Sequence, residues 1–425
     1  MLYNTEYQVR SVVIRIGIVG CGRILNAHLQ GYKALREAGV NFRITALSAR
    51  REEDALMFVR RGQGPLPRPA VLPPESGDPL AAPQTYLSDF QDDDVEVYTD
   101  YRKMIEEGNI DAVNDFTTLA LHHQVGAAAL RAGKHLLTQK PLAISVKAAQ
   151  RLVEMAQERG LTFGVFENVR QRRQTRAYGW AVQSGQIGVP QMVLSGSLGG
   201  LWSPDKVVAD TPWRHRKLEG GGGGSLDIGV HQFDMLRYVL GEVAWVSGVA
   251  RTFEPVRYRR DASGNVVEAV KVDVDDTYLA VAGFENGAIA QMLWSWAGHG
   301  GPLEIPGAPA FFGSSCCIKG GEVIKDNGSH EPLLQRFEEE LSTQDRGRFF
   351  PLGLTNTFAL NQLDWLRAIE GGRDPETSGR EGLRDLACAF GLLESSEIGR
   401  KVSLDEVLSG AVSKYQADIN THYGL

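Results

Sequence analysis

An apolar run that leads into a glycine turn constrains the fold of this chain most strongly. Val12–Val19 is apolar apart from Arg15, which is typical of a strand buried on both faces of a parallel sheet. Gly20 and Gly22 follow at once, and large apolar residues then recur at helical spacing over residues 25–35. A strand, a glycine turn and an amphipathic helix in this order predict the start of a dinucleotide-binding βαβ unit.

The same alternation continues to about residue 167. It predicts a Rossmann domain with a doubly wound parallel sheet over residues 12–167. Residues 62–94 interrupt the pattern, because seven prolines there prevent a regular helix or a central strand. We interpret this segment as a surface insertion rather than a domain. The further elements that we expect are strands at 42–47, 110–116, 135–138 and 161–166, and helices at 101–107, 122–132 and 145–159.

Residues 168–425 carry a different pattern and form the predicted second domain. Strands that alternate or are rich in β-formers are expected at 191–197, 244–253, 276–284 and 288–295. Asn286-Gly287 is a turn signal between the last two of these strands. Amphipathic helices are expected at 358–369 and 383–397. The predicted fold class is therefore α/β, with a Rossmann domain followed by an α+β domain that contains an antiparallel sheet.

The glycine turn is suited to holding a pyrophosphate. Glycines let backbone N–H groups approach phosphates closely, and the N-terminus of the next helix adds a partial positive charge. The predicted cofactor contacts are Gly20 and Gly22 together with Arg23 and Ile24, which open the helix. Leu25 stands at the third glycine position of the G-x-G-x-x-G pattern, so this motif is incomplete.

The end of the second strand bears on the choice of cofactor. An Asp or Glu usually stands there to accept the adenosine ribose hydroxyls, but this chain has no carboxylate at that place. Ser48 and Arg50 are placed to hold a 2′-phosphate instead, which favours NADP over NAD. The alternative is that Arg50 is an exposed residue at a helix start.

Three polar residues downstream of the turn are suited to oxidising an alcohol. Asp227 and His231 follow the glycine run Gly220–Gly224, and on a helix their i, i+4 spacing would place both on one face. Lys140 ends a predicted strand and is followed by a proline. Loss of hydride from a secondary alcohol requires a base for the hydroxyl proton, and imidazole titrates near neutrality, so His231 is the first choice. Lys140 is expected to stabilise the charge on the reacting oxygen, and either it or His231 can finally hold the proton.

Several segments together resemble the Gfo/Idh/MocA oxidoreductases. They are GIVGCGRI, TTLALHH, GKHLLTQKPLA and GGGGSLDIGVHQFD, in this order, and the resemblance covers nearly the whole chain outside the insertion and the extreme N-terminus. Lys140 matches the lysine of the family's Glu-Lys-Pro, while Asp227 and His231 match its Asp-x-x-x-His. The resemblance implies an NAD(P)-dependent dehydrogenase or reductase that acts on a sugar, inositol or related polyol.

The resemblance also implies further cofactor contacts. Thr117 and His122 match the threonine and histidine of the family's cofactor-side loop, although Thr118 and Leu119 replace its Pro and Asn. Gln139 stands where the family usually has Glu, so a contact to the nicotinamide ribose would persist as an amide hydrogen bond without charge.

Substrate contacts and assembly are implied in the same way. The family places substrate-binding residues after the last Rossmann strand and before the glycine run, which points to Asn168, Arg170 and Arg214. The alternative for each of these three residues is that it lies in a solvated loop and does not contact the substrate. The resemblance further implies that the sheet of the second domain is open and mostly antiparallel. This sheet often forms an oligomer interface in the family, so a homo-oligomer, either a dimer or a tetramer, is expected.

Composition argues against other classes of partner. The formal net charge of -7 disfavours nucleic acid and anionic membranes, which require a concentrated basic field. No apolar run approaches the roughly 20 residues that span a bilayer, and Met1–Arg15 lacks the order of a signal peptide. The four cysteines show no disulfide pattern and the histidines no zinc motif, so we expect a cytoplasmic protein without a metal site.

Two other functions stay open at this point. A glycosidase that uses retained NAD through transient oxidation would need the same hydride-transfer residues. A non-catalytic sensor would bind dinucleotide and a protein partner, but it would have no need for Lys140, Asp227 and His231 together.

Overall fold

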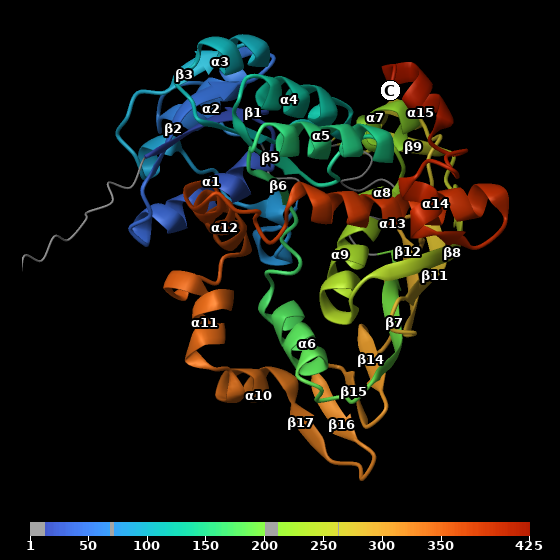
Figure 1. Cartoon of the computed structure of the whole chain (residues 1–425). Helices are drawn as coiled ribbons and strands as arrows, with labels where there is room; N and C mark the ends of the chain where they lie inside the picture. The colour runs from blue at the N-terminus through green and yellow to red at the C-terminus, as the bar shows by residue number, and fades with distance from the viewer. Residues whose placement is uncertain (1–12, 69–71, 200–210, 262) are drawn as a thin grey trace, which may run out of the picture.

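A computed structural model of the chain describes residues 13–68, 72–199, 211–261 and 263–425. Its N-terminal part is a six-stranded sheet in the order β3-β2-β1-β4-β5-β6, and all of its described pairs are parallel. This is the strand order of a Rossmann domain, as predicted (Figure 1). The strands are β1 (Ile14–Val19), β2 (Phe42–Ser48), β3 (Glu96–Tyr98), β4 (Ala112–Asp115), β5 (His135–Gln139) and β6 (Phe163–Phe166).

Helices cover both faces of this sheet, as the alternating pattern requires. The strand predicted from Val12 begins at Ile14, and Val12 itself lies outside the described residues. β3 was not anticipated, because it is a short edge strand with a charged residue and little burial. The helices are α1 (Leu25–Glu37), α2 (Glu52–Val59), α3 (Tyr101–Glu107), α4 (Leu119–Arg131) and α5 (Val146–Glu158).

The proline-rich insertion is a cover on the Rossmann domain and adds no domain of its own. Its described part, which omits residues 69–71, contains short 3-10 turns, two of which begin with a proline. The backbone N–H of Thr85 donates to Asn26 Oδ1 of α1 at 3.1 Å, which ties the segment to the first helix. The turns are η1 (Pro74–Ser76), η2 (Pro79–Ala81) and η3 (Leu87–Asp89).

The second part is built on a large open sheet in the order β17-β16-β15-β14-β7-β12-β11-β8-β18, with β13 beside β7. Its described pairs are antiparallel except β7 with β12, which confirms the mostly antiparallel sheet. β9 and β10 form a separate two-stranded ribbon. The strands are β7 (Pro190–Leu198), β8 (Val243–Arg251), β9 (Val256–Arg260), β10 (Val266–Lys271), β11 (Thr277–Phe284), β12 (Ile289–Ser295), β13 (Leu303–Glu304), β14 (Ala310–Gly313), β15 (Cys316–Lys319), β16 (Glu322–Lys325), β17 (His330–Pro332) and β18 (Val402–Ser403).

Helices pack on one face of this sheet, and some return to the Rossmann domain (Figure 1). The 20-residue helix α13 packs against β8 and also against α5 and β6, so it joins the two parts. The helices are α6 (Arg173–Gln183), α7 (Lys217–Gly220), α8 (Gly224–Asp227), α9 (Gly229–Leu240), α10 (Leu333–Glu340), α11 (Thr343–Phe349), α12 (Thr357–Gly371), α13 (Gly379–Ile398), α14 (Leu404–Leu408) and α15 (Ala417–Tyr423), with 3-10 turns η5 (Pro212–His215) and η6 (Pro351–Gly353).

One helix of the predicted second domain packs on the Rossmann domain. α12 falls within residues 168–425, yet it packs directly on α1. A Cβ at Gly31 would lie 2.9 Å from Phe358 Cβ, so glycine permits the two helices to approach closely. Gln362 Nε2 also donates to the carbonyl of His28 at 3.1 Å. An amphipathic pattern predicts that a helix has a buried face but not which domain buries it.

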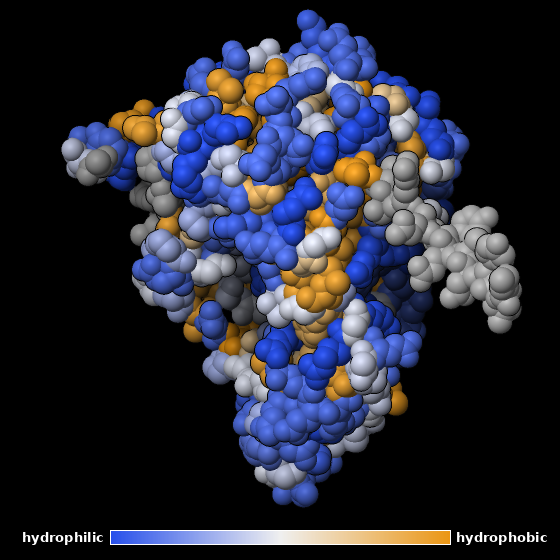
Figure 2. Space-filling model, turned by 90° about the vertical axis from the view of Figure 1, so that its left-hand side faces the viewer, coloured by the Kyte–Doolittle hydropathy of each residue, from blue (hydrophilic) through white to orange (hydrophobic). Residues whose placement is uncertain are grey.

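The molecular surface on the side of the Rossmann sheet edge is mainly hydrophilic. Figure 2 shows this side, with a hydrophobic strip between larger hydrophilic areas. No helix among the described residues is long and apolar enough to cross a membrane.

Candidate active site

A cavity of about 1120 Å³ lies between the Rossmann sheet and the residues that flank the glycine run of the second part. It opens at the carboxyl ends of β1, β2, β4 and β5, where doubly wound sheets bind their ligands. Fourteen of the sequence-predicted site residues line it: Gly20, Gly22, Arg23, Ile24, Ser48, Arg50, Thr117, His122, Gln139, Lys140, Asn168, Arg214, Asp227 and His231.

The glycine turn fits a dinucleotide pyrophosphate. Gly20 has φ +99°, and a Cβ there would lie 2.6 Å from the backbone of Phe116, so this position requires glycine. A Cβ at Gly22 would meet no atom within 4 Å, so this side of the turn is open to a ligand. The first turn of α1 carries no acidic residue that would repel a phosphate.

The part of the cavity beside the end of β2 is where a Rossmann domain binds adenosine, and we call it the adenosine end. Two guanidinium groups, those of Arg50 and Arg68, line the cavity there. Arg50 lines it and is exposed, whereas Ser48 at the end of β2 is buried. A carboxylate is also present, because Asp54 at the start of α2 lines the same wall. Hydrogen bonds from Arg51 and Arg68 hold the pKa of Asp54 below its ordinary value. Asp54 is thus paired with two cations, while Asp78 is a second carboxylate that lines the cavity.

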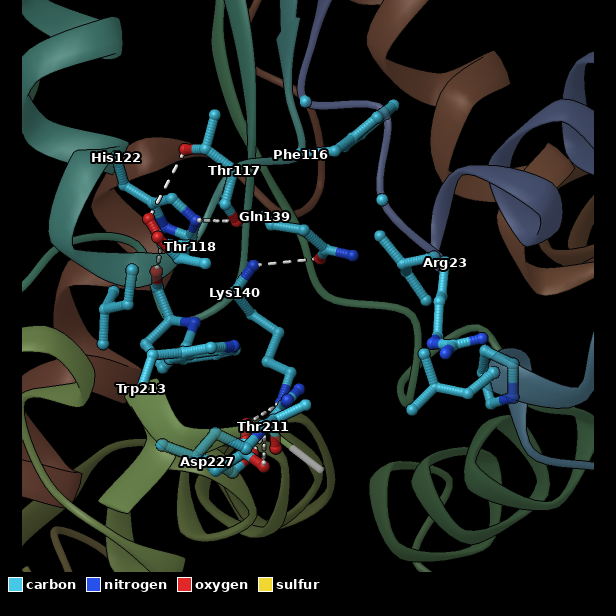
Figure 3. A pocket seen from close by; sticks show the side chains of 18 of the residues that line it. Arg23, Phe116, Thr117, Thr118, His122, Gln139, Lys140, Thr211, Trp213 and Asp227 are labelled. Carbon is cyan, nitrogen blue, oxygen red and sulfur yellow. Dashed lines mark hydrogen bonds and ion pairs between the residues drawn. The ribbon is translucent and has the colours of Figure 1, made fainter. Parts of the chain in front are cut away.

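His122 supports the loop after β4 from within the protein. It is 1% exposed, and its ring nitrogens lie 2.8 Å from Pro141 O and 3.2 Å from Thr117 O. Thr117 Oγ1 in turn donates to Asp115 Oδ1 at 2.7 Å. Both polar atoms of the ring face protein carbonyl groups, so His122 holds the loop that lines this part of the cavity (Figure 3).

Gln139 is held by a buried histidine that the sequence analysis did not single out. Its Nε2 lies 3.1 Å from His28 Nε2, and its Oε1 accepts from the backbone N–H of Lys140 at 3.1 Å. Burial lowers the pKa of His28 well below its ordinary value, so the ring is neutral and accepts from the amide. An amide suits this pairing because it offers both a donor and an acceptor.

Lys140 and Asp227 meet across the cavity. Lys140 Nζ lies 3.1 Å from Asp227 Oδ1 and donates to the backbone carbonyl of Asp227 at 2.6 Å. Figure 3 shows Lys140 extending towards Asp227, with Arg23 on the opposite side of the cavity. Arg214 Nε lies 3.3 Å from Asp227 Oδ2. Burial alone would raise the pKa of Asp227, but the charges of Lys140 and Arg214 hold it below its ordinary value, so this carboxylate is ionised.

His231 is paired with a carboxylate that sequence reasoning treated only as a domain boundary. Its Nδ1 lies 2.5 Å from Glu167 Oε1, and Glu167 is 2% exposed. Burial lowers the pKa of His231, and the charge of Glu167 opposes this shift. Although burial also disfavours the Glu167 anion, the charge of His231 brings the pKa of Glu167 below its ordinary value. A carboxylate directly after the last Rossmann strand was the available signal.

Asp227 and His231 do not share one continuous helix. Asp227 ends α8 and His231 lies in the first turn of α9, with Ile228 between the two helices. Both residues nevertheless line the cavity. The expectation that Asp227 and His231 lie on one helix is therefore corrected. The end of the glycine run folds as the separate short helix α8 before α9 begins.

The glycine run is anchored by a buried carboxylate. Asp275 accepts from the backbone N–H groups of Gly223 at 2.9 Å and Ser225 at 2.8 Å, and from Ser225 Oγ at 2.8 Å. A Cβ at Gly223 would lie 1.6 Å from the carbonyl oxygen of Asp275. The run is therefore a fixed, close-packed turn that sets the position of Asp227.

Of the three predicted substrate contacts, Asn168 and Arg214 line the cavity and Arg170 does not. The guanidinium of Arg214 lies 4.3 Å from the ring centroid of Trp213, which also lines the cavity and was not singled out as a site residue. Arg170 is buried, and its Nε donates to Asp234 Oδ1 at 2.7 Å. The expectation for Arg170 is corrected, because acidic residues of α9 and α13 neutralise it inside the protein.

Within the part of the chain that the structure describes, no group of three or more His, Cys, Asp or Glu side chains is arranged to hold a metal ion.

Comparisons with known proteins agree with this geometry. The model described as "GFO/IDH/MocA C-terminal domain" matches residues 176–313, and that described as "Oxidoreductase family, NAD-binding Rossmann fold" matches residues 78–167. The 1,5-anhydro-D-fructose reductase of Ensifer adhaerens is 27% identical over 311 residues, covering 72% of this chain and 84% of that protein. The myo-inositol 2-dehydrogenase of Thermotoga maritima is 25% identical over 403 residues, covering 93% of this chain and all of that protein.

Solved structures show the same fold. The levoglucosan dehydrogenase in complex with NADH superposes with a TM-score of 0.69 at 20% identity, covering 92% of this chain and 99% of that one. The two matched family models together span more than half of the residues. The chain therefore belongs to the Gfo/Idh/MocA family of oxidoreductases.

Proposed function

We propose that this protein is an NAD(P)-dependent dehydrogenase or reductase that acts on a secondary alcohol, or the corresponding carbonyl, of a sugar, inositol or related polyol. The observation that carries the proposal is the meeting of Lys140 with Asp227, beside His231, in the cavity that also holds the glycine turn. Bound nicotinamide would supply the hydride acceptor or donor. The protein must then handle the hydroxyl proton and the charge on the oxygen.

His231 is the proposed general base. Its Nδ1 is held by Glu167, which leaves Nε2 to take the hydroxyl proton during oxidation and to return it during reduction. The pairing fixes the ring orientation and the tautomer, because Nδ1 donates to the carboxylate. Lys140 donates a hydrogen bond to the reacting oxygen and stabilises its developing negative charge. Asp227 holds the ammonium group of Lys140 in place.

The substrate class follows from the polar wall of the second part and from the relatives. Their printed names include an anhydrofructose reductase and an inositol dehydrogenase. Asn168 and Arg214 offer donors to substrate hydroxyl groups, and the ring of Trp213 offers an apolar face. Hydrogen-bond donors suit the hydroxyl groups of a polyhydroxylated ligand, and a flat apolar ring suits its C–H face.

The cofactor proposed to bind best is NADP. Ser48 and Arg50 line the adenosine end, and Asp54 nearby is already engaged by Arg51 and Arg68. We expect Arg50→Ala to weaken NADP+ binding by about tenfold or more and NAD+ binding much less. Arg60→Ala is the matched control, because Arg60 is exposed and does not line the cavity. Equal affinities of the native protein for both cofactors would reject this preference.

A homo-oligomer through the large sheet is proposed as well. Five apolar residues on neighbouring strands are between 38% and 54% exposed, and their partners across the sheet place them on one face: Met192, Val249, Leu279, Val281 and Ile289. Such a patch is typical of a protein interface. Light scattering should show a dimer or tetramer that Leu279→Lys converts to smaller species. A monomeric native protein at micromolar concentration would reject this assembly.

The redox function is tested by the absorbance of the nicotinamide. Purified protein should change NAD(P)H absorbance with a member of a panel of sugars and polyols. Lys140→Ala or His231→Ala should abolish turnover while cofactor binding persists. Full turnover in both variants would reject the residue assignment, and absence of dinucleotide binding would reject the function itself. We expect the reaction to take place in the cytoplasm, where the free thiols of its four cysteines would stay reduced.

A further inference from the structure

Arg68 brings a positive charge from the proline-rich insertion onto the glycine turn. Its Nη1 donates to the backbone carbonyl of Cys21 at 2.9 Å, and Cys21 lies between Gly20 and Gly22. Its Nη2 forms an ion pair with Asp54 Oδ1 at 2.5 Å. Arg68 also lines the cavity and is 27% exposed, so it combines a fixed position with access to a ligand.

The described part of the insertion is anchored on the Rossmann domain. Gln84 Nε2 donates to the carbonyl of Met57 in α2 at 3.0 Å, and the backbone N–H of Thr85 donates to Asn26 of α1. Residues 78–80 line the same cavity as Arg68. The insertion therefore contributes part of the cavity wall beside the turn that connects β1 to α1.

Arg68 and the glycine turn together are suited to an anion, although the carboxylates Asp54 and Asp78 line the same cavity. The turn after β1 and the N-terminus of α1 are where a Rossmann domain holds a pyrophosphate. A guanidinium carries five N–H donors, and among the described residues two nitrogens of Arg68 are engaged, one with a carbonyl and one with a carboxylate. The remaining donors are available to phosphate oxygens, with which arginine forms short, charge-assisted hydrogen bonds.

We propose that Arg68 binds the pyrophosphate of the dinucleotide, so that the insertion completes the cofactor site from the side opposite α1. The proposal rests on the proposed function, since it takes the cavity to be the dinucleotide site. It assigns a ligand contact to a segment that would otherwise only cover the surface. Its contacts with Cys21 and Asp54 position the guanidinium before the ligand arrives.

A series of adenine ligands separates this role from a purely structural one. Isothermal titration of the full-length protein with adenosine, ADP, NAD+ and NADP+ would compare native protein with Arg68→Met and Arg68→Lys. We expect Arg68→Met to weaken ADP, NAD+ and NADP+ by about 10- to 100-fold and adenosine by less than about threefold. Arg68→Lys should lose less, because it keeps the charge but not the fork of donors.

Arg61→Met is the matched control. Arg61 lies at the border of the same insertion and pairs with Asp89, but it does not line the cavity, so its loss should leave all four affinities unchanged. Unchanged ADP affinity in Arg68→Met would overturn the proposal. An equal loss for adenosine and ADP would overturn it too, because that result means that Arg68 only maintains the shape of the insertion. Native protein that binds ADP but neither dinucleotide would instead contradict the proposed function.

Discussion

The ammonium nitrogen of Lys140 lies 3.1 Å from Oδ1 of Asp227, although the two residues are 87 positions apart and lie in different parts of the fold. Lys140 directly follows β5, and Asp227 ends the short helix α8. This contact lies across the cavity from Arg23 (Figure 3). It brings a hydrogen-bond donor from the Rossmann domain to the wall that carries His231.

Replacing Lys140 with methionine should remove the proposed stabilisation of the reacting oxygen. We expect kcat to fall by about 10²- to 10³-fold, the effect of losing one donor to a developing oxyanion. Cofactor affinity should persist, as measured by fluorescence titration with NADPH. Lys134→Met is the control, because Lys134 lies before the other end of β5 and donates to the carbonyl of Ile110. A kcat within twofold of the native value would exclude Lys140 from the reaction.

Replacing Glu167 with glutamine should change how activity depends on pH. The Glu167 carboxylate raises the pKa of His231 against the lowering effects of burial and of the charges on Lys140 and Arg172. Without this carboxylate the pKa of His231 falls further, so the base form persists to lower pH. The acidic limb of the kcat/KM profile should therefore move to lower pH, and kcat should fall by about 10- to 100-fold.

Glu167→Ala separates orientation from charge at the same position. Glutamine keeps an oxygen that can accept from Nδ1 of His231, whereas alanine removes it, so alanine should lose more kcat for a similar shift of the limb. If the acidic limb stays in place in both variants, Glu167 does not act through His231.

The sequence predicted the residues that follow regular elements. Gly20 and Lys140 come directly after buried parallel strands, and carboxyl ends of such strands meet at one edge of a sheet, so their shared cavity was expected. His231 was expected there from its motif. The partner of His231 was not predicted, because the contact with Glu167 joins residues 64 positions apart in different parts of the fold.

Other features depended on contacts that a local pattern does not contain. Arg170 was expected in the cavity because it follows the last Rossmann strand, but α9 and α13 provide three carboxylates that keep it buried. The insertion was recognised from its prolines, yet its place over the glycine turn follows from the contacts of Arg68 and Thr85. The short strands β14 to β17 lack a long alternating run and were missed.

Replacing Arg170 with methionine should destabilise the fold. Removing one partner of a buried ion pair costs about 3–5 kcal/mol, because Asp234 is left buried without its cation. Urea unfolding monitored by circular dichroism would measure this loss. A substrate-binding role would instead raise KM while leaving the unfolding free energy unchanged.

The destabilisation should shrink as the pH falls. Burial already raises the pKa of Asp234 well above its ordinary value, and loss of Arg170 raises it further. A carboxyl whose folded pKa exceeds its unfolded pKa takes up a proton on folding, so it favours the folded state more as the pH falls through the folded pKa. The gap in unfolding free energy between variant and native protein should therefore be smaller at about pH 5.5 than at about pH 7.5. A gap that widens at acidic pH would contradict this origin.

Replacing Gly223 with alanine should disable the site through the backbone alone. A Cβ at this position would lie 1.6 Å from the carbonyl oxygen of Asp275, so the glycine run or the segment around Asp275 must move. Asp227 lies four residues further on, and the backbone N–H of Asp227 donates to the carbonyl of Gly223 at 2.9 Å. A shift of the run therefore moves the carboxylate that holds Lys140, and displacements of about 1 Å at a reacting centre reduce rates by about 10²-fold.

Gly222→Ala provides the comparison for this backbone effect. A Cβ at Gly222 would lie 3.1 Å from Leu393 Cδ1 and 3.2 Å from Leu226 Cβ, so its nearest neighbours are side-chain atoms that can adjust. We expect Gly223→Ala to lose about 10²-fold in kcat with NADPH affinity retained, and Gly222→Ala to lose less than about tenfold. Because Gly220–Gly224 do not line the cavity and the glycine turn after β1 does, weakened cofactor binding in Gly223→Ala would indicate general unfolding. Equal kcat values for the two variants would mean that the close approach of Gly223 to Asp275 does not set the position of Asp227.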